Sequence, residues 1–165
     1  MQHQITTYEG KGKYAFVSYS HKDEKIVYPI IMQLQKEGYQ LWLDLGIEIG
    51  SDWPDVIASK LNKCDAFLVF LSKNAGDSHN CRKERNYAFA LNKNVLPVLL
   101  EEMDFSPVEE MQLSSVQALL AYKMEASEVA NKIMKFNILD NCKANNVKLD
   151  QKEELKRYTI TFFNC

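Results

Sequence analysis

The stretch AFLVFLSKNAGDSHNCRKERNYAFALNKNVLPVLL, residues 66–100, decides the fold. Its pattern predicts an apolar strand over 66–72, a polar loop over 73–80, a helix over 81–92 and a second apolar strand over 95–100. Neither strand alternates polar and apolar residues, which is typical of strands buried on both faces of a parallel sheet. The stretch therefore predicts a strand–helix–strand unit.

Glu84 stands out in the predicted helix because it shares a face with the apolar residues Cys81, Ala88 and Leu91. Burying a carboxylate on an apolar face costs folding free energy, so such a position suggests that the carboxylate has a role. It could serve in a cleft, where it would stabilise positive charge or bind ribose hydroxyls. It could instead be a surface acid paired with a neighbouring basic residue. A position near the helix start is expected to keep the Glu84 carboxylate ionised.

The rest of the chain continues the alternation of strands and helices. The expected strands are 14–19, 39–44, 66–72, 95–100 and 118–123, and the expected helices are 24–37, 53–62, 81–92 and one capped by Ser127. This alternation predicts an α/β domain with a flavodoxin-like, five-stranded parallel sheet in the order 2-1-3-4-5. Residues 1–13 are expected to be a flexible lead-in, and residues 138–165 a C-terminal extension with an added strand near its end.

The predicted strand order also predicts where a ligand would bind. In open parallel sheets the crevice lies beyond the carboxyl ends of the strands, where the order reverses. That rule places the loop 20–23 opposite the segment 72–80, with Glu84 facing the same crevice. His21 and His79 fall on opposite sides of it, but no Asp or Cys stands at ligand spacing, so we expect no metal site.

Composition excludes several classes of protein. The chain has 165 residues, 46% hydrophobic and 25% charged, with a net charge of −2, which is typical of one soluble domain and argues against a nucleic-acid partner. No apolar run is long enough for a membrane span, so we expect a cytoplasmic protein. The four cysteines lie far apart, which favours reduced thiols over a zinc site or a disulfide framework.

Four segments, taken in order, resemble the TIR (Toll/interleukin-1 receptor) domain of the bacterial kind. They are YAFVSYSHKDE (14–24), WLDLGIEIGSDWPDVIASKLNKCDAFLVFLS (42–72), SHNCRKERNYAFALNKNVLPVLL (78–100) and MQLSSVQALLAYK (111–123). No one segment is decisive, but their order and spacing are specific. The resemblance implies the TIR fold over residues 14–137.

The resemblance also implies an activity. Enzymatic members carry an essential Glu on the helix after strand three, and Glu84 occupies that position. We therefore expect an NAD+ glycohydrolase or cyclase that breaks the nicotinamide–ribose bond without a cofactor. The product would be ADP-ribose or a cyclic or conjugated signal for a separate effector protein, in bacterial anti-phage defence. Many enzymatic members have Trp where this chain has Asn80.

The resemblance implies two further sets of residues. The expected substrate-binding residues are Tyr19, Ser20, His21, Asp44, Leu45, Trp53, Ser72 and Asn80. Among them, Trp53 could equally be a core anchor and Ser72 could merely close a turn. Leu45, Ile47 and Ile49 belong to the BB loop, through which TIR domains associate. The alternatives are a non-catalytic TIR scaffold and an enzyme like a nucleoside deoxyribosyltransferase.

Overall fold

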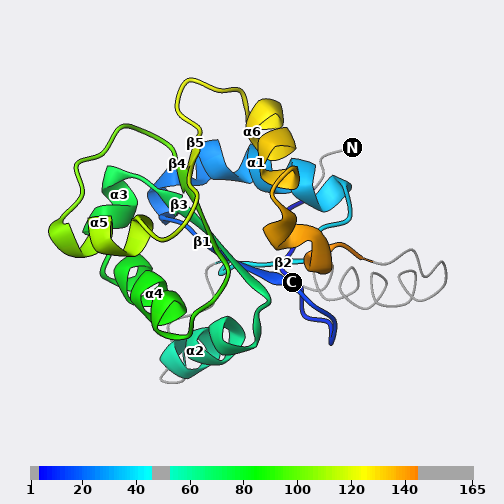
Figure 1. Ribbon diagram of the computed structural model, residues 1–165. Helices are drawn as coiled ribbons and strands as arrows, with labels where there is room; N and C mark the ends of the chain where they lie inside the picture. Colours follow the sequence, from blue (N-terminus) through cyan, green and yellow to red (C-terminus); the bar gives the residue numbers. More distant parts are fainter. Residues whose placement is uncertain (1–3, 46–52, 145–165) are drawn as a thin grey trace, which may run out of the picture.

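A computed structural model describes residues 4–45 and 53–144 (Figure 1). Its centre is a five-stranded sheet in the order β2-β1-β3-β4-β5, with every neighbouring pair parallel. The strands are β1 (Ala15–Ser18), β2 (Leu41–Trp42), β3 (Ala66–Leu71), β4 (Val95–Leu99) and β5 (Leu119–Leu120). The predicted fold class and strand order are confirmed.

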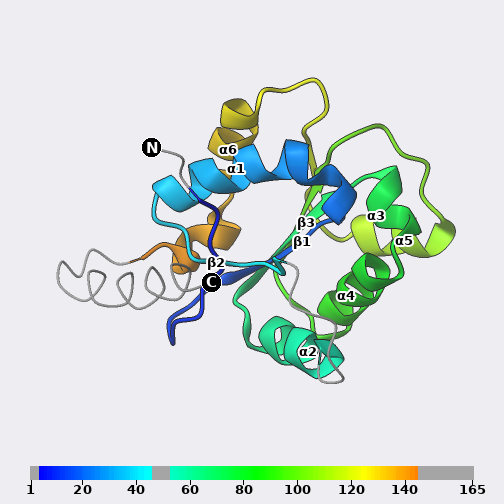
Figure 2. The same ribbon diagram turned by 180° about the vertical axis from the view of Figure 1, so that it is seen from behind.

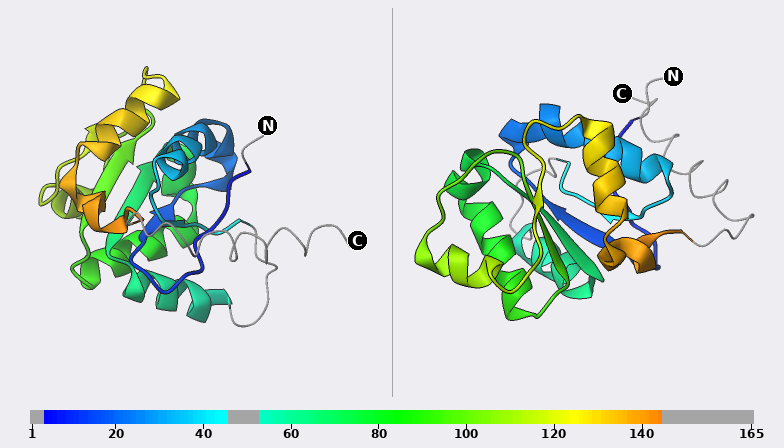
Figure 3. Two further views of the ribbon diagram at one scale, coloured as in Figure 1. Left: turned by 90° about the vertical axis from the view of Figure 1, so that its right-hand side faces the viewer. Right: turned by 45° about the horizontal axis from the view of Figure 1, so that its top comes forward.

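Helices cover both faces of the sheet (Figures 1 and 2). On one face, α1 (Glu24–Lys36) lies beside α6 (Ala126–Met134), as the right-hand view of Figure 3 shows. On the other face lie α2 (Trp53–Lys63) and α4 (His79–Ala90). Successive residues of β1 point to opposite faces, so Val17 joins the α1–α6 core and Phe16 joins the α2–α4 core.

Some boundaries differ from the prediction, each for a local reason. The predicted loop 73–80 contains a short helix, α3 (Lys73–Asp77), because the Ser72 hydroxyl accepts a hydrogen bond from the Ala75 N–H at 3.0 Å and caps it. Helix α4 begins at His79, capped by Ser78, two residues before the predicted start. The residue before α6 is Glu125, so the prediction that Ser127 caps this helix was wrong.

The chain before β1, expected to be a flexible lead-in, is bonded to β2 over its described part. The Tyr8 N–H donates to the Leu41 carbonyl at 2.8 Å, and the Leu43 N–H donates to Thr7 Oγ1 at 2.9 Å. The Trp42 indole N–H also donates to Glu9, at 3.1 Å. These bonds hold the segment against β2.

The chain after α6 closes the other part of this edge. A short 3-10 helix, η2 (Asn137–Cys142), buries Leu139 and Cys142, and the Gln40 N–H donates to the Cys142 carbonyl at 2.7 Å. The start of the predicted C-terminal extension is thus part of the packed domain. The strand expected near the chain's end lies outside the described residues. None of the helices in 4–45 and 53–144 is long and apolar enough to cross a membrane.

Candidate active site

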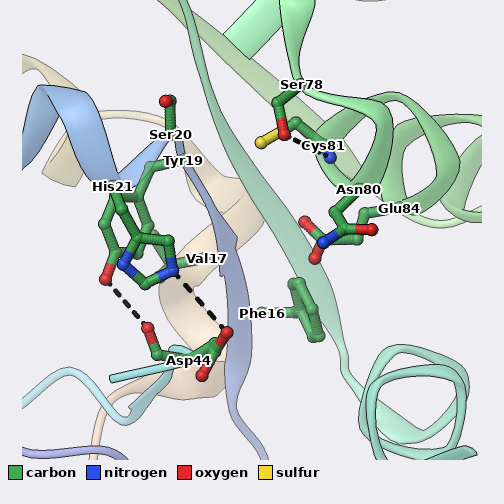
Figure 4. A pocket seen from close by; sticks show the side chains of 10 residues that line it. All are labelled: Phe16, Val17, Tyr19, Ser20, His21, Asp44, Ser78, Asn80, Cys81 and Glu84. Atoms are coloured by element: carbon green, nitrogen blue, oxygen red, sulfur yellow. Dashed lines mark hydrogen bonds and ion pairs between the residues drawn. The ribbon is translucent and has the colours of Figure 1, made fainter. Parts of the chain in front are cut away.

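A cavity of about 90 Å³ lies beyond the carboxyl end of β1, where the strand order reverses between β1 and β3 (Figure 4). It is lined by Phe16, Val17, Tyr19, Ser20, His21, Asp44, Ser78, Asn80, Cys81 and Glu84. These residues come from the end of β1, the turn that follows it, the end of β2 and the first turns of α4. The cavity is small, so only part of a nucleotide would fit inside.

Glu84 enters the cavity from the second turn of α4 and is partly buried. The hydroxyl of Ser18, the last residue of β1, donates a hydrogen bond to Glu84 Oε2 at 2.5 Å. Burial is the largest influence and raises the pKa of Glu84 to about 7, with a smaller raising effect from the Asp44 charge. The Ser18 hydrogen bond and His21 lower the same pKa by less.

The expectation that the helix start keeps Glu84 ionised was wrong. The helix dipole acts most strongly within the first turn. Helix α4 begins at His79, so Glu84 lies beyond that turn. Desolvation of the carboxylate outweighs that field. Nor does Glu84 pair with its basic neighbour: Arg85 is buried and its Nη2 donates to Glu109 Oε1 at 2.6 Å.

The opposite wall carries a histidine between two carboxylates. His21 Nδ1 lies 3.1 Å from Glu24 Oε1, and His21 Nε2 lies 3.6 Å from Asp44 Oδ2. The Tyr19 hydroxyl donates to the Asp44 carbonyl at 2.9 Å. Figure 4 shows this wall facing Glu84 across the cavity. The cavity therefore presents two carboxylates, one on each side.

On the α4 side, Asn80 and Glu84 lie next to each other, one helical turn apart (Figure 4). Asn80 is exposed at the cavity, where its amide can both donate and accept hydrogen bonds. Cys81 is buried, and burial raises the pKa of its thiol. A neutral thiol is a poor nucleophile, which leaves the carboxylates as candidates for a reactive group.

The structure brings together most of the predicted substrate-binding residues. Tyr19, Ser20, His21, Asp44 and Asn80 line the cavity with Glu84. Ser72 does not, because its buried hydroxyl donates to Asp23 at 2.5 Å. Leu45 is exposed and does not line the cavity. The Trp53 side chain and the loop residues Ile47 and Ile49 lie outside the described residues.

Sequence reasoning missed other lining residues. They are Phe16, Val17 and Cys81, and it also missed Ser18, which donates a hydrogen bond to Glu84. The signal for Ser18 was present, since it is the one serine in the apolar run YAFVSY, residues 14–19. His79 is exposed and does not line the cavity. Over 4–45 and 53–144, no group of His, Cys, Asp or Glu could hold a metal ion.

Comparisons with known proteins agree with this fold. The chain resembles the CMP N-glycosidase BcmB of Clostridium botulinum, with a TM-score of 0.56 and 16% identity, over 74% of this chain and 99% of that one. It also resembles the TIR domain of the Toll-related receptor TRR-2 from Hydra magnipapillata, with a TM-score of 0.53 and 14% identity, over 64% of this chain and 81% of that one. No curated protein matched.

Identities this low show the shared fold alone. Membership of a family comes from a sequence model described as "TIR domain", which matches residues 15–133. The match runs from the first residue of β1 to near the end of α6, and so includes the whole sheet and the cavity. The chain therefore belongs to the TIR domain family.

Proposed function

We propose that this TIR domain cleaves the bond between nicotinamide and ribose in NAD+, with Glu84 as the catalytic carboxylate. The observation that carries the proposal is the Glu84 carboxylate itself. It is desolvated, held by Ser18 at 2.5 Å, and faces a cavity at the switch point of the sheet. A carboxylate in such a place is a candidate for catalysis because its environment is costly to maintain.

The chemistry suits a carboxylate. The bond between ribose C1′ and the ring nitrogen breaks, and its electron pair leaves with neutral nicotinamide. The sugar passes through a cation-like transition state, which an ionised Glu84 would stabilise. Water then adds to C1′ and loses a proton, giving ADP-ribose. If a hydroxyl or ring nitrogen of the substrate attacks C1′ instead, the product is cyclic or conjugated.

The negative charge of the cavity favours a substrate whose ring is cationic before the bond breaks. Asp44 and Glu84 both line the cavity, and the charge of Asp44 raises the pKa of Glu84. A positively charged nicotinamide ring would relieve that repulsion, whereas a neutral base would not. The nicotinamide ring would enter the cavity, with the ribose at its mouth and the rest of the dinucleotide outside it.

The likeness to a CMP N-glycosidase supports a second candidate, cleavage of a neutral nucleotide such as CMP. Cytosine needs a proton as it leaves, which a protonated Glu84 could supply. The two candidates thus require opposite protonation states of Glu84. Their pH dependence separates them, because NAD+ cleavage would rise with pH through about 7 and CMP cleavage would fall.

Association through the BB loop belongs to the proposal as well. Leu45, at the edge of that loop, exposes 42% of its surface and so is available for contact with another chain. We propose that Leu45, Ile47 and Ile49 pack against a second TIR domain, and that the product reaches a separate effector protein in anti-phage defence. Specific activity would then rise with protein concentration. A scaffold without catalysis would associate but leave NAD+ intact.

The test is chromatography of NAD+ incubated with the purified chain at high concentration. We expect release of nicotinamide, reduced by two orders of magnitude or more in Glu84→Gln, since the neutral amide stabilises a cation poorly. Glu110→Gln, an exposed acid on another helix, is the matched control and should leave the rate unchanged. CMP is assayed in parallel. Intact NAD+ in the wild type, or full activity in Glu84→Gln, would contradict the proposal.

A further inference from the structure

Asp23 is a buried acid that the proposed chemistry does not use. Only 6% of its surface is exposed. It ends the 3-10 helix η1 (His21–Asp23) and stands at the N-cap of α1, yet its side chain makes no capping bond to that helix. An ionised carboxylate buried in this way is costly unless hydrogen bonds satisfy it.

The bonds that satisfy Asp23 come from the other side of the sheet's crevice. Ser72 Oγ donates to Asp23 Oδ2 at 2.5 Å, and Asn74 Nδ2 donates to Asp23 Oδ1 at 2.7 Å. The Ser72 hydroxyl also accepts from the Ala75 N–H at 3.0 Å, which fixes the direction of its proton toward Asp23. Hydrogen bonds to an ionised group are about twice as strong as neutral ones.

These bonds join the two walls of the cavity. Asp23 lies in the same turn as Ser20 and His21, since its N–H donates to the Ser20 carbonyl at 2.8 Å. Ser72 begins the segment that runs through α3 to Ser78 and into α4, which carries Glu84. One carboxylate therefore connects the wall that bears His21 to the wall that bears Glu84.

We propose that Asp23 is a positioning residue that sets the separation between His21 and Glu84 through Ser72 and Asn74. This inference rests on the proposed function, in which Glu84 is catalytic. The charged groups acting on Glu84 are Asp44 from the end of β2 and His21 from η1, with Ser18 as its hydrogen-bond donor. His21 and Asp23 belong to η1, whereas Asp44 follows β2. Releasing η1 moves His21 and leaves Asp44 in place, so the lowering effect of His21 weakens and the pKa of Glu84 rises.

The experiment compares Asp23→Asn with Asp77→Asn, the same change at an exposed acid of α3. The Glu84 side-chain carboxyl is titrated by ¹³C NMR and assigned against Glu84→Gln. We expect its pKa to rise by about half a unit in Asp23→Asn and to stay constant in Asp77→Asn. With NAD+ at pH 8, we expect kcat to fall about tenfold in Asp23→Asn, with KM changed less than about threefold, because a misplaced group costs rate more than binding.

An unchanged Glu84 titration in folded Asp23→Asn, with kcat equal to that of Asp77→Asn, would overturn the inference. If Asp23→Asn does not fold, Asn74→Ala replaces it, since it removes one of the two bonds and Asn74 is only partly buried. The same rise in the pKa of Glu84 is then required. If the wild type leaves NAD+ intact, the proposed function fails, while the titration still decides the role of Asp23.

Discussion

At the residue scale, Glu84 combines burial with a hydrogen bond from Ser18. Burial raises its pKa to about 7, and the Ser18 bond opposes that rise. Both the protonated and the ionised form of the carboxylate are therefore accessible near neutral pH. A small change in its surroundings moves that balance, which makes pH the most direct probe of its role.

The first prediction concerns the rate of NAD+ cleavage as a function of pH. Because the ionised form of Glu84 stabilises the transition state, kcat/KM should fall tenfold per unit below about pH 7 and level off above it. Ser18→Ala removes an influence that lowers the pKa of Glu84, so its profile should move to higher pH. Steady-state rates between pH 5 and 9 measure both. A profile that falls with rising pH would mean that Glu84 acts as an acid.

The second prediction concerns stability. The folded pKa of Glu84, about 7, lies above its ordinary value of 4.5, so the folded state binds the proton more tightly. Stability contributed by the protonated form is present below pH 4.5 and is lost as pH rises through 7. Glu84→Gln mimics the protonated form and should be more stable than wild type at pH 8 by about 1–3 kcal/mol, a range reduced because the group is partly exposed.

Thermal unfolding at two pH values checks this expectation. At pH 5 the wild-type Glu84 is protonated, so the two proteins should unfold at similar temperatures. At pH 8 the variant should unfold at the higher temperature. An equal difference at both pH values would show that the change acts through packing and not through ionisation.

The sequence was enough to single out Glu84, but it did not predict the raised pKa of its carboxylate. Its place in an apolar stripe of one helix is a local property, and helical spacing is enough to find it. Desolvation depends on what surrounds the carboxylate, such as Ser18 and Phe16 from β1, and these residues are more than sixty positions away. The start of α4 at His79 moved Glu84 out of the first turn, which spacing alone did not reveal.

At the element scale, helix α5 (Pro107–Leu113) is bonded to α4 by polar groups, while its last residue, Leu113, packs against the core. It has no buried residue. Its Glu109 accepts from Arg85 at 2.6 Å and completes a capping box with Ser106, and its Gln112 donates to Asn86 at 3.0 Å. Arg85 and Asn86 directly follow Glu84 in α4. The attachment of α5 therefore depends on the same helix that carries the candidate catalytic group.

The third prediction tests this attachment. Glu109→Gln leaves the buried Arg85 without its charged partner and weakens the capping box, so we expect a loss of about 2–4 kcal/mol in the free energy of unfolding. Glu110→Gln changes the neighbouring, exposed acid and should cost less than about 0.5 kcal/mol. Chemical denaturation measures both variants. Equal losses would mean that the Arg85–Glu109 pair contributes little.

Short elements were predicted less well than long ones. Turn residues dominate 73–80, and their composition predicted a loop, yet Ser72 caps one turn of helix there. Strand β2 has two residues where six were expected, because only Leu41 and Trp42 pair in register with β1. Composition indicates which residues favour a turn, but a single capping or pairing bond decides between a loop and a short element.

At the scale of the whole molecule, the sheet order was predicted from the alternation of apolar runs and amphipathic helices. That pattern is repeated across the chain, so one misplaced boundary does not change it. The two cores follow from it, one on each face of the sheet. The contacts of residues 4–13 were not predictable, because a polar, glycine-containing segment has no periodicity to read.

The bonds along β2 also determine how copies of this domain can meet. An edge strand with unpaired backbone groups can pair with another chain. Here Thr7 and Tyr8 occupy the edge at Leu41 and Leu43, and the chain near Cys142 occupies it at Gln40. The opposite edge, β5, has only two residues. Over the described residues, both edges therefore disfavour growth of a continuous sheet from one copy to the next, and association through side chains and loops is favoured.

The fourth prediction follows for a shortened chain. Deleting residues 1–9 uncovers the β2 edge, so we expect aggregation visible by light scattering at concentrations where the full chain stays clear. Tyr8→Phe keeps the backbone bond to Leu41 and is the matched control. A shortened chain that shows no increase in light scattering would mean that the segment does not prevent β2 from pairing with other chains. Aggregation of the shortened chain alone would mean that residues 4–13 shield the β2 edge from other chains.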